Sequence, residues 1–259
     1  MSDSFPRIQP LGDSAVQVVL RGPQGMLRDP QGVLREMIDL GLNRRVQALA
    51  VRLGQSSARP EGVGGQGRMP SAPTEGQGAL RPEGGGEAVP AYASLVVHFD
   101  LMRIDYQTVS GWIQAQLEGL EERGLPAARV VEIPVIYGGA HGPDLDFVAR
   151  HNGLTPAEVV AIHSAGEYPV YMLGFTPGFP YLGGLDARIA APRLETPRSR
   201  VPAGSVGIAG SQTGIYSLDS PGGWRLIGWT PLRLFDPAAD PPALLNVGDV
   251  VKFRVMSEE

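Results

Sequence analysis

The chain contains no cysteine among its 259 residues, so disulfide bonds, thiolate nucleophiles and cysteine-ligated metals are excluded. It has only four histidines, and none of them stands in a recognisable zinc-binding spacing such as HExxH. No apolar run approaches the length of a membrane-spanning helix, and MSDSFPRIQP at the start lacks the basic and apolar regions of a signal peptide. We therefore expect a cytoplasmic protein with no metal site and no membrane partner.

An excess of basic charge is also missing. Lysine and arginine number 22 against 27 aspartate and glutamate residues, which gives a formal charge of −5. This balance argues against nucleic acid or an anionic membrane surface as a partner. A hydrophobic content of 42% and a charged content of 19% are typical of a globular protein, and the length allows one large or two modest domains.

Common nucleotide and nucleophile motifs are absent as well. No GxSxG, P-loop or GxGxxG-after-strand pattern is convincing, and Gly207-Ile208-Ala209-Gly210 has neither the length nor the following helix of a phosphate loop. We expect this chain to bind no cofactor by itself. The sequence assigns no catalytic residue.

The first part of the chain alternates strand and helix patterns. Expected strands lie at 14–20, 94–100 and 130–137, and expected helices lie within 31–53 and at 109–120. These elements predict a small α+β domain at residues 1–132.

The first expected helix is amphipathic. Its apolar stripe consists of Leu42, Val46, Leu49 and Leu53. The polar residues expected to face solvent are Asn43, Arg44, Arg45 and Arg52.

Residues 54–87 interrupt this pattern. Ten of these 34 residues are glycine and four are proline, and no hydrophobic period survives. Such a composition buries too little apolar surface to offset the entropy of ordering. We predict a flexible insertion in a surface loop.

Residues 133–259 form the second predicted domain. Pro143 suits the first position of a helix that stops at Asn152-Gly153. Thr155-Pro156-Ala157-Glu158 has the pattern of a capping box, and its helix is expected to end at Gly166. Glycine and proline then punctuate short β-branched or aromatic runs up to residue 231, which favours a twisted, closed β structure.

The densest of these punctuated stretches is Gly174-Phe175-Thr176-Pro177-Gly178-Phe179-Pro180-Tyr181-Leu182. It is followed in order by Pro197-Arg198, by VPAGSVGIAG at 201–210, by QTGIY at 212–216 and by SPGGW at 220–224. This ordered series resembles the family of the 5-oxoprolinase B subunit, also called allophanate hydrolase subunit 1. That family includes the kinase inhibitor KipI and the first half of the carboxyltransferase domain of urea carboxylase.

The resemblance implies a fold and an activity. The implied fold is a small N-terminal α+β domain followed by a cyclophilin-like β-barrel. The implied function is that of the B subunit of an ATP-dependent 5-oxoprolinase, which opens 5-oxoproline to glutamate together with the A subunit and a homologous C subunit. The chain is then expected to be inactive alone, with ATP used by the assembled complex.

Two other functions stay open at this point. The chain could act as a KipI-type inhibitor that docks on a histidine kinase without chemistry. It could also belong to a biotin-dependent urea or amide carboxyltransferase, or to an allophanate hydrolase.

Candidate substrate-binding residues lie in the punctuated region. They are His163, Gly174, Phe175, Pro177, Gly178, Phe179, Tyr181, Arg198, Gln212, Tyr216 and Trp224. Backbone amides of 174–184 and 204–214 are expected as donors to an oxyanion or carboxylate. Arg198 is expected either to clamp a carboxylate or to form a surface salt bridge, and His163 either lines a cleft or is a structural residue at a helix end.

Two positions depart from the family pattern. Ser217 stands where a proline is common, and Trp229 stands where an arginine is common. Loss of that arginine removes a fixed cation with planar donors.

Overall fold

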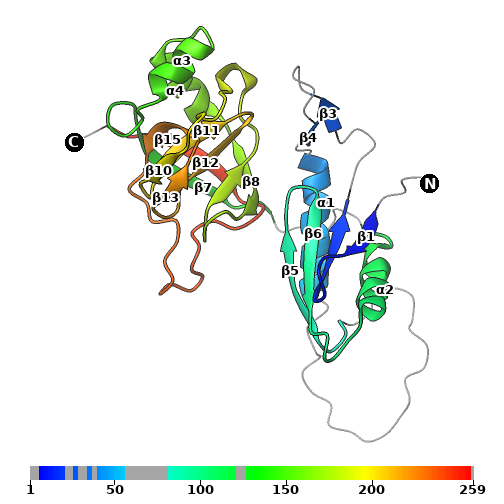
Figure 1. Ribbon diagram of the computed structural model, residues 1–259. Coiled ribbons are helices and arrows are strands. Elements are labelled where there is room, and N and C mark those ends of the chain that lie inside the picture. Colours follow the sequence, from blue (N-terminus) through cyan, green and yellow to red (C-terminus); the bar gives the residue numbers. More distant parts are fainter. Residues whose placement is uncertain are drawn as a thin grey trace, which may run out of the picture. The chain divides into compact units, whose positions relative to one another are not determined.

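The computed structural model describes residues 6–20, 26–28, 34–36, 40–55, 81–120 and 127–257. The chain divides into two compact units, Met1–Pro126 and Ala127–Glu259 (Figure 1). Each unit has its own hydrophobic core. The predicted α+β class is confirmed. The strand at 130–137, predicted as the end of the first domain, instead belongs to the second unit, because both of its edges pair with strands of the barrel.

The first unit is built on a four-stranded antiparallel sheet in the order β1-β2-β6-β5. Its strands are β1 (Arg7–Pro10), β2 (Ala15–Val19), β6 (Ser94–Phe99) and β5 (Gly85–Pro90). A separate antiparallel pair is formed by β3 (Met26–Arg28) and β4 (Leu34–Glu36).

Two helices cover one face of this sheet. The helices are α1 (Leu40–Gln55) and α2 (Tyr106–Leu117). Alternate strand residues such as Val16, Val18 and Leu95 are fully buried and join the apolar stripe of α1 in one core. This is the arrangement that a period of two in strands and 3.6 in helices dictates.

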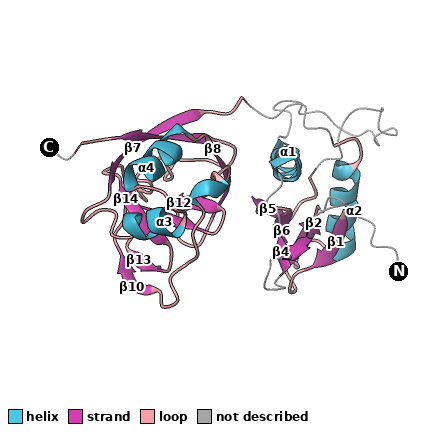
Figure 2. Ribbon diagram, turned by 90° about the horizontal axis from the view of Figure 1, so that it is seen from above, coloured by secondary structure: helices cyan, strands magenta, loops and turns pink. Residues whose placement is uncertain are grey.

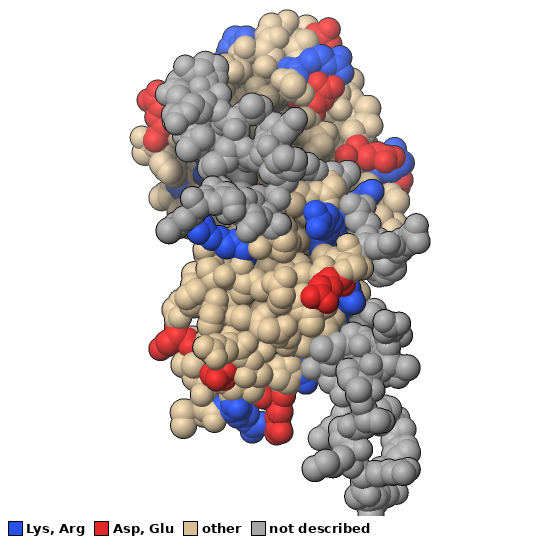
Figure 3. Space-filling model, turned by 90° about the vertical axis from the view of Figure 1, so that its right-hand side faces the viewer, with Lys and Arg blue, Asp and Glu red and all other residues tan. Residues whose placement is uncertain are grey.

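Helix α2 carries no charged residue along its length. Charge is confined to its flanks, where Asp105 caps the N-terminus by accepting a hydrogen bond from Thr108 N at 2.8 Å and Glu118 follows the last turn. Figure 3 shows a broad area without charged side chains on the side of the first unit where α2 and β1 lie.

Asn43 is a correction to the predicted solvent face of α1. Its side chain is fully buried, and its amide nitrogen donates to the carbonyl oxygens of Ala91 at 3.2 Å and Tyr92 at 3.1 Å. Arg44 and Arg45 are exposed as predicted. Helical spacing alone cannot show that a polar side chain satisfies carbonyl groups of a distant connection. Here the Asn43 side chain ties α1 to the connection between β5 and β6.

The predicted insertion at 54–87 extends too far on both sides. Gly54 is still part of α1, and residues 85–87 form the first half of β5. The Arg81 guanidinium donates to the carbonyl oxygens of Gly85 and Gly86. The remaining part of the predicted insertion, 56–80, lies outside the described residues.

The second unit is a closed barrel of seven strands in the order β11-β12-β9-β8-β15-β7-β14. In chain order the strands are β7 (Val130–Tyr137), β8 (Tyr168–Leu173), β9 (Pro180–Leu182), β11 (Ser205–Ala209), β12 (Gln212–Ile215), β14 (Arg225–Trp229) and β15 (Val250–Val255). Strands β7 and β15 run parallel, and the other pairs are antiparallel. A short ribbon of β10 (Arg198–Val201) and β13 (Ser220–Gly222) lies outside this barrel.

Two helices, α3 (Leu145–His151) and α4 (Pro156–Ala165), lie across one end of the barrel, and a 3-10 turn covers Ala187–Ile189 (Figures 1 and 2). The capping box of α4 and its stop at Gly166 are confirmed. The start of α3 is corrected, because Asp144 is the N-cap and Pro143 therefore precedes the helix.

Side chains of the barrel alternate between an inner and an outer face. In β12, Thr213 and Ile215 are buried inside the barrel, whereas Gly214 faces outward beneath Trp224 and Phe179. The outward face of β9, β11 and β12 carries a second, smaller apolar cluster. This outer face holds most of the residues predicted for a site.

Candidate functional site

Five aromatic side chains meet on the outer face of the barrel, and we call them the outer aromatic cluster. Its members are Phe175, Phe179, Tyr181, Tyr216 and Trp224. Phe179 lies at the centre, with ring centroids 4.9 Å from Tyr181, 5.3 Å from Tyr216 and 5.5 Å from Trp224, all edge to face. Edge-to-face packing is the favoured geometry for such rings.

Glycines in the neighbouring strands make room for these rings. A Cβ on Gly214 would lie 2.9 Å from Cζ3 of Trp224 and 3.1 Å from Cζ of Phe179. A Cβ on Gly222 would overlap the hydroxyl of Tyr216. The glycine-rich motifs thus serve close packing of aromatic rings on backbone.

Most of this cluster is buried, and Phe175 is its exposed member. Phe179, Tyr216 and Trp224 have exposed fractions of 1%, 1% and 5%, whereas Phe175 is 59% exposed. Phe175 also has φ of +66°, an unfavourable conformation for a bulky L-residue. Such strain at an exposed aromatic residue is typical of functional loops.

The loop around Phe175 is held by its own backbone. Gly174 N donates to Phe179 O at 3.1 Å, Thr176 N donates to Gly174 O at 2.8 Å, and Phe179 N donates to Thr176 O at 3.1 Å. Gly183 N, Gly204 N and Gly210 N likewise donate to carbonyl oxygens of the chain. The predicted wall of amide donors is therefore corrected at these positions: their N–H groups are already used internally.

Two residues of this loop differ in what they present. Pro177 is exposed, whereas Gly178 has φ of +74° and its missing Cβ would lie 2.9 Å from Cβ of Phe235. A side chain at 178 would disturb folding as much as binding.

Ser217 and Trp229, the two departures from the family pattern, both make hydrogen bonds. Ser217 Oγ donates to Pro177 O at 2.7 Å and lies 3.2 Å from Thr176 Oγ1, so it fastens the Phe175 loop. Trp229 Nε1 donates to Ala203 O at 2.8 Å, and its ring stacks on His141 at 5.2 Å.

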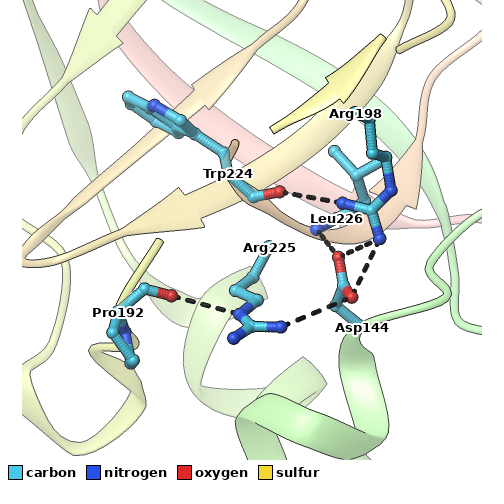
Figure 4. A network of polar contacts seen from close by, with 6 residues as sticks. All are labelled: Asp144, Pro192, Arg198, Trp224, Arg225 and Leu226. Atoms are coloured by element: carbon cyan, nitrogen blue, oxygen red, sulfur yellow. Dashed lines mark hydrogen bonds and ion pairs between the residues drawn. The ribbon is translucent and has the colours of Figure 1, made fainter. Parts of the chain in front are cut away.

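A buried carboxylate beside the cluster organises two arginines (Figure 4). Arg198 Nη2 donates to both oxygens of Asp144, at 3.0 and 2.9 Å, and Arg225 Nη1 lies 4.0 Å from Asp144 Oδ1. Leu226 N donates to the same carboxylate at 2.7 Å.

Each arginine also binds a backbone carbonyl. Arg198 Nη1 donates to Trp224 O at 3.3 Å, and Arg225 Nε donates to Pro192 O at 3.1 Å. In Figure 4 the indole of Trp224 points away from Asp144, so the network holds this residue by its main chain only. The sequence predicts that Arg198 either clamps a carboxylate or forms a surface salt bridge. Its guanidinium forms a salt bridge within the protein, and the partner is the buried Asp144.

The two tyrosines of the cluster feel a positive charge. Burial raises the pKa of both Tyr181 and Tyr216, and the charge of Arg193 opposes that rise at both hydroxyls. The Arg193 guanidinium carbon lies 5.8 Å from the ring centre of Trp224. A cation therefore borders the outer aromatic cluster.

His163 belongs to the barrel interior. It is fully buried, with Nδ1 2.8 Å from the Tyr137 hydroxyl and Nε2 3.0 Å from Thr213 Oγ1. Thr213 Oγ1 donates its proton to Gly207 O at 3.0 Å, so it accepts from Nε2–H of the histidine, and Tyr137 donates to Nδ1. Burial lowers the pKa of His163 to about 3. The residue is a neutral core histidine and not part of a surface site.

The predicted residues separate into two groups. Five of them form the outer aromatic cluster, and Gln212 lies on the same outer face, opposite Ala209 of the neighbouring strand. His163, inside the barrel, and Arg198, paired with Asp144, do not belong to this cluster. Sequence reasoning missed Arg193 and Asp144. Pro192-Arg193 is a second Pro-Arg dipeptide five residues before Pro197-Arg198, and that repetition is the one signal that the sequence offered.

In the part of the chain that the structure describes, every helix is too short or too polar to be a membrane span. The same residues contain no group of three or more His, Cys, Asp or Glu side chains placed to hold a metal ion.

The fold is a small α+β unit followed in the chain by a closed seven-stranded barrel. A family model that matches this sequence names the class of domain. The chain belongs to the family described as carboxyltransferase domain, subdomain C and D, whose model matches residues 78–245. The matched part contains the outer aromatic cluster and the Asp144 network.

Curated relatives make the assignment more specific. The chain is 51% identical over 183 residues to the 5-oxoprolinase B subunit of Bacillus subtilis, covering 67% of this chain and 76% of that protein. It is 60% identical over 133 residues to the 5-oxoprolinase B subunit of Escherichia coli, covering 51% of this chain and 61% of that protein. A putative urea carboxylase of Emericella nidulans is 28% identical over 161 residues, which cover 53% of this chain and 13% of that protein. The predicted membership of the family of 5-oxoprolinase B subunits is confirmed.

Solved structures share the fold. TTHA0988 matches with a TM-score of 0.69 and 35% identity, covering 95% of this chain and 40% of that longer chain. The urea carboxylase of Kluyveromyces lactis matches with a TM-score of 0.67 over 99% of this chain and 22% of that protein. The identity there is 19%, so this likeness concerns the fold alone.

Proposed function

We propose that the chain is the B subunit of an ATP-dependent 5-oxoprolinase, helping to form the site that opens 5-oxoproline to glutamate together with the A and C subunits. The observation that carries this proposal is the identity of 51% and 60% with proteins named as B subunits of 5-oxoprolinase. A protein named as a subunit works with other subunits, which supports the multi-chain part of the proposal.

The role of this chain is to bind and orient the substrate. The outer aromatic cluster offers apolar ring surface at Phe175 and Tyr181, against which a small planar lactam ring packs with exclusion of water. The Phe175 loop is fastened by Ser217 and by its own hydrogen bonds, so the surface is formed before the ligand arrives. Preorganisation of this kind lowers the entropy lost on binding.

ATP chemistry is assigned to the assembly and not to this chain. Phosphorylation of the amide oxygen by ATP makes the resonance-stabilised carbonyl carbon of a lactam electrophilic. The residues 207–210 lie in the β11–β12 hairpin, with no helix following them, so they lack the strand–loop–helix geometry that cradles phosphates. This chain alone is therefore expected to hydrolyse neither ATP nor 5-oxoproline.

A separate partner chain, the homologous C subunit, completes the site in this proposal. TTHA0988 and the Kluyveromyces urea carboxylase support it, because in both a region of this fold is part of a longer polypeptide. Phe175, exposed and strained at the rim of the cluster, forms one wall of this site, and the C subunit would supply the wall that faces it.

The test is to co-express the chain with its C subunit, separate the products by size-exclusion chromatography, and measure ATP hydrolysis once the A subunit is added. We expect one co-eluting complex and ATP hydrolysis that depends on 5-oxoproline and on all three chains. Turnover by this chain alone would contradict the proposal. Failure to co-elute at micromolar concentration would favour the KipI-type inhibitor.

A carboxyltransferase role is the second candidate, favoured by the family model and by the match to a putative urea carboxylase. Supplying urea, bicarbonate and a biotin carboxylase in place of 5-oxoproline and the A subunit distinguishes the two. Urea-dependent ATP hydrolysis without 5-oxoproline-dependent hydrolysis would select this second candidate.

A further inference from the structure

Arg193 differs from most other arginines of the barrel unit. Nine arginines lie between residues 127 and 257. Seven have a carboxylate oxygen within 4.0 Å, namely Arg129, Arg188, Arg198, Arg200, Arg225, Arg233 and Arg254. Among the described residues, Arg150 and Arg193 have no such partner, and Arg150 lies in the last turn of α3, where its charge complements the helix dipole.

The exposed side chain of Arg193 is directed onto the outer aromatic cluster. Its guanidinium carbon is 5.8 Å from the ring centre of Trp224, and the Tyr181 ring is 6.0 Å from that same ring. Trp224 is only 5% exposed, so the exposed Arg193 stands over the ring of a buried indole. A cation held on an aromatic face keeps its N–H donors available at the edge of the guanidinium plane.

The backbone that presents Arg193 is anchored on both sides. Gly210 N donates to Ala191 O at 2.7 Å, and Leu194 N donates to Gly223 O at 2.7 Å. Between them, Pro192 O accepts from Arg225 Nε at 3.1 Å. These three contacts fix the backbone at Arg193, so less backbone entropy is lost when its side chain binds a ligand.

One carboxylate links both partners of this cation–aromatic pair (Figure 4). Asp144 holds Arg225, which binds the carbonyl next to Arg193, and it holds Arg198, which binds the carbonyl of Trp224. Asp144 is thus a positioning residue for Arg193 and Trp224 together. The charge of Arg193 also reaches Tyr181 and Tyr216, where it opposes the burial-driven rise in pKa.

We propose that Arg193, held against Trp224 and bordered by Tyr181, binds the carboxylate of a small organic acid. A guanidinium meets a carboxylate through two parallel N–H···O hydrogen bonds, which fixes orientation as well as charge. The proposal rests on the proposed function, in which 5-oxoproline is the acid and its lactam ring lies against the aromatic side chains. Arg193 thus takes the role of carboxylate clamp, which is one of the two roles that the sequence predicts for Arg198.

The experiment compares Arg193→Gln with wild type in the assembly of the full chain with the A and C subunits. We expect KM for 5-oxoproline to rise roughly 10- to 100-fold, as for a lost charge-assisted hydrogen bond, with kcat changed less than about threefold. The inhibition constant of 2-pyrrolidinone, which has the same ring without the carboxylate, should stay within about twofold of wild type. Arg193→Lys keeps the positive charge but loses the paired N–H donors of the guanidinium. Its KM for 5-oxoproline should lie between those of wild type and Arg193→Gln.

Arg150→Gln is the matched control, because Arg150 also lacks a carboxylate partner among the described residues but lies on α3, outside the outer aromatic cluster. It should leave KM unchanged. An Arg193→Gln assembly with wild-type KM, or with equal losses for 5-oxoproline and 2-pyrrolidinone, would overturn the proposal. Failure of the variant to co-elute with the C subunit would also overturn it, since Arg193 would then be an interface residue.

The carboxylate site and the proposed function fail in different ways. If the wild-type assembly shows no 5-oxoproline-dependent ATP hydrolysis, the proposed function is wrong. The site is then decided on the full chain alone by the indole N–H resonance of Trp224, assigned with Trp224→Phe, during titration with 5-oxoproline. A saturable shift that Arg193→Gln abolishes and 2-pyrrolidinone does not cause supports the site; no shift in wild type overturns it.

Discussion

The barrel unit has two clusters of aromatic and polar side chains, one inside the barrel around His163 and one outside it around Trp224. The inner cluster stacks His163 on Phe253 with centroids 4.5 Å apart and pairs every polar atom of the ring within the protein. The outer cluster has an exposed, strained Phe175 and a bordering arginine with no carboxylate partner among the described residues.

The difference shows which properties distinguish a core from a site. Both clusters contain rings, hydroxyls and a residue that the sequence predicts to touch substrate. Only the outer cluster combines backbone strain, an exposed ring and a cation that no carboxylate of the described residues neutralises. The presence of a titratable residue in a glycine-rich sequence therefore says less about function than whether its charge is paired in the folded protein.

The largest expected effect comes from removing the carboxylate that frames the outer cluster. Asp144→Ala leaves the buried ends of Arg198 and Arg225 without their anion and Leu226 N without its acceptor. Breaking a buried ion pair typically costs about 3–5 kcal/mol. We expect a loss near the lower value, because the Arg198 side chain is 28% exposed. Urea unfolding followed by tryptophan fluorescence measures it.

Glu132→Gln is the control for that experiment, because Glu132 pairs with Arg254 on the exposed surface of the same unit. Its unfolding midpoint should stay that of wild type. Equal midpoints for Asp144→Ala and wild type would mean that the Asp144 network does not hold the ribbon and β14 in place.

A second effect concerns the inner cluster and depends on pH. The pKa of His163 is lowered to about 3 in the folded chain by burial, whereas an unfolded histidine titrates near 6.5. Below pH 6.5 the unfolded state binds a proton that the folded state refuses, so stability falls as pH drops from 6.5 toward 3. At pH 5 the free energy of unfolding is about 2 kcal/mol lower than at pH 7.5 because of this histidine.

Unfolding free energies of wild type and His163→Gln between pH 7.5 and 5 test this value. The variant is expected to be less stable at every pH, yet its stability should change less with pH. His151→Gln, which removes an exposed histidine, should keep the wild-type slope. Parallel slopes for wild type and His163→Gln would show that His163 takes up its proton in the folded state.

How much the sequence reveals differs between elements and contacts. The capping box at Thr155, the stop at Gly166 and the strand at 130–137 follow from local rules that act within a few residues. Local rules do not show which of Arg193 and Arg198 is paired with a carboxylate. Both follow a proline within one short segment, and which of them is neutralised depends on Asp144, which lies 54 residues from Arg198 in sequence.

The same limit explains Asn43 and His163. The spacing of α1 places Asn43 on a polar stripe, but the turn that it satisfies comes 48 residues later. Local signals place His163 correctly in the last turn of α4, yet its burial depends on the closure of β7, β12 and β15 around it. Contacts between distant segments decide such roles, and periodicity carries no record of them.

A smaller effect is expected at Ser217, which fastens the Phe175 loop to the barrel. Ser217→Ala removes the 2.7 Å hydrogen bond to Pro177 O and the contact with Thr176 Oγ1. The expected loss of stability is about 1 kcal/mol. Because the loop then samples more conformations, KM of the assembly for its substrate should rise while kcat stays within about twofold. An unchanged KM would mean that the loop is rigid without this serine.

The smallest net effect on stability, and the sharpest separation of stability from function, is expected at Phe175. A residue with a Cβ at φ of +66° costs roughly 1–2 kcal/mol relative to glycine. Phe175→Gly should therefore be more stable than Phe175→Ala by about 1 kcal/mol, the reverse of the order found in helices and strands. Relative to wild type, relief of strain in the glycine variant offsets the lost edge-to-face contacts with Phe179 and Tyr216. Both variants should nevertheless reduce kcat/KM of the assembly about tenfold or more, because the exposed ring is gone in each.

Val255→Ala, at a residue of similar 60% exposure, should leave activity unchanged. If the alanine variant is the more stable one, Phe175 is not held in a strained conformation. If both variants keep full activity, the exposed ring does not contribute to the site.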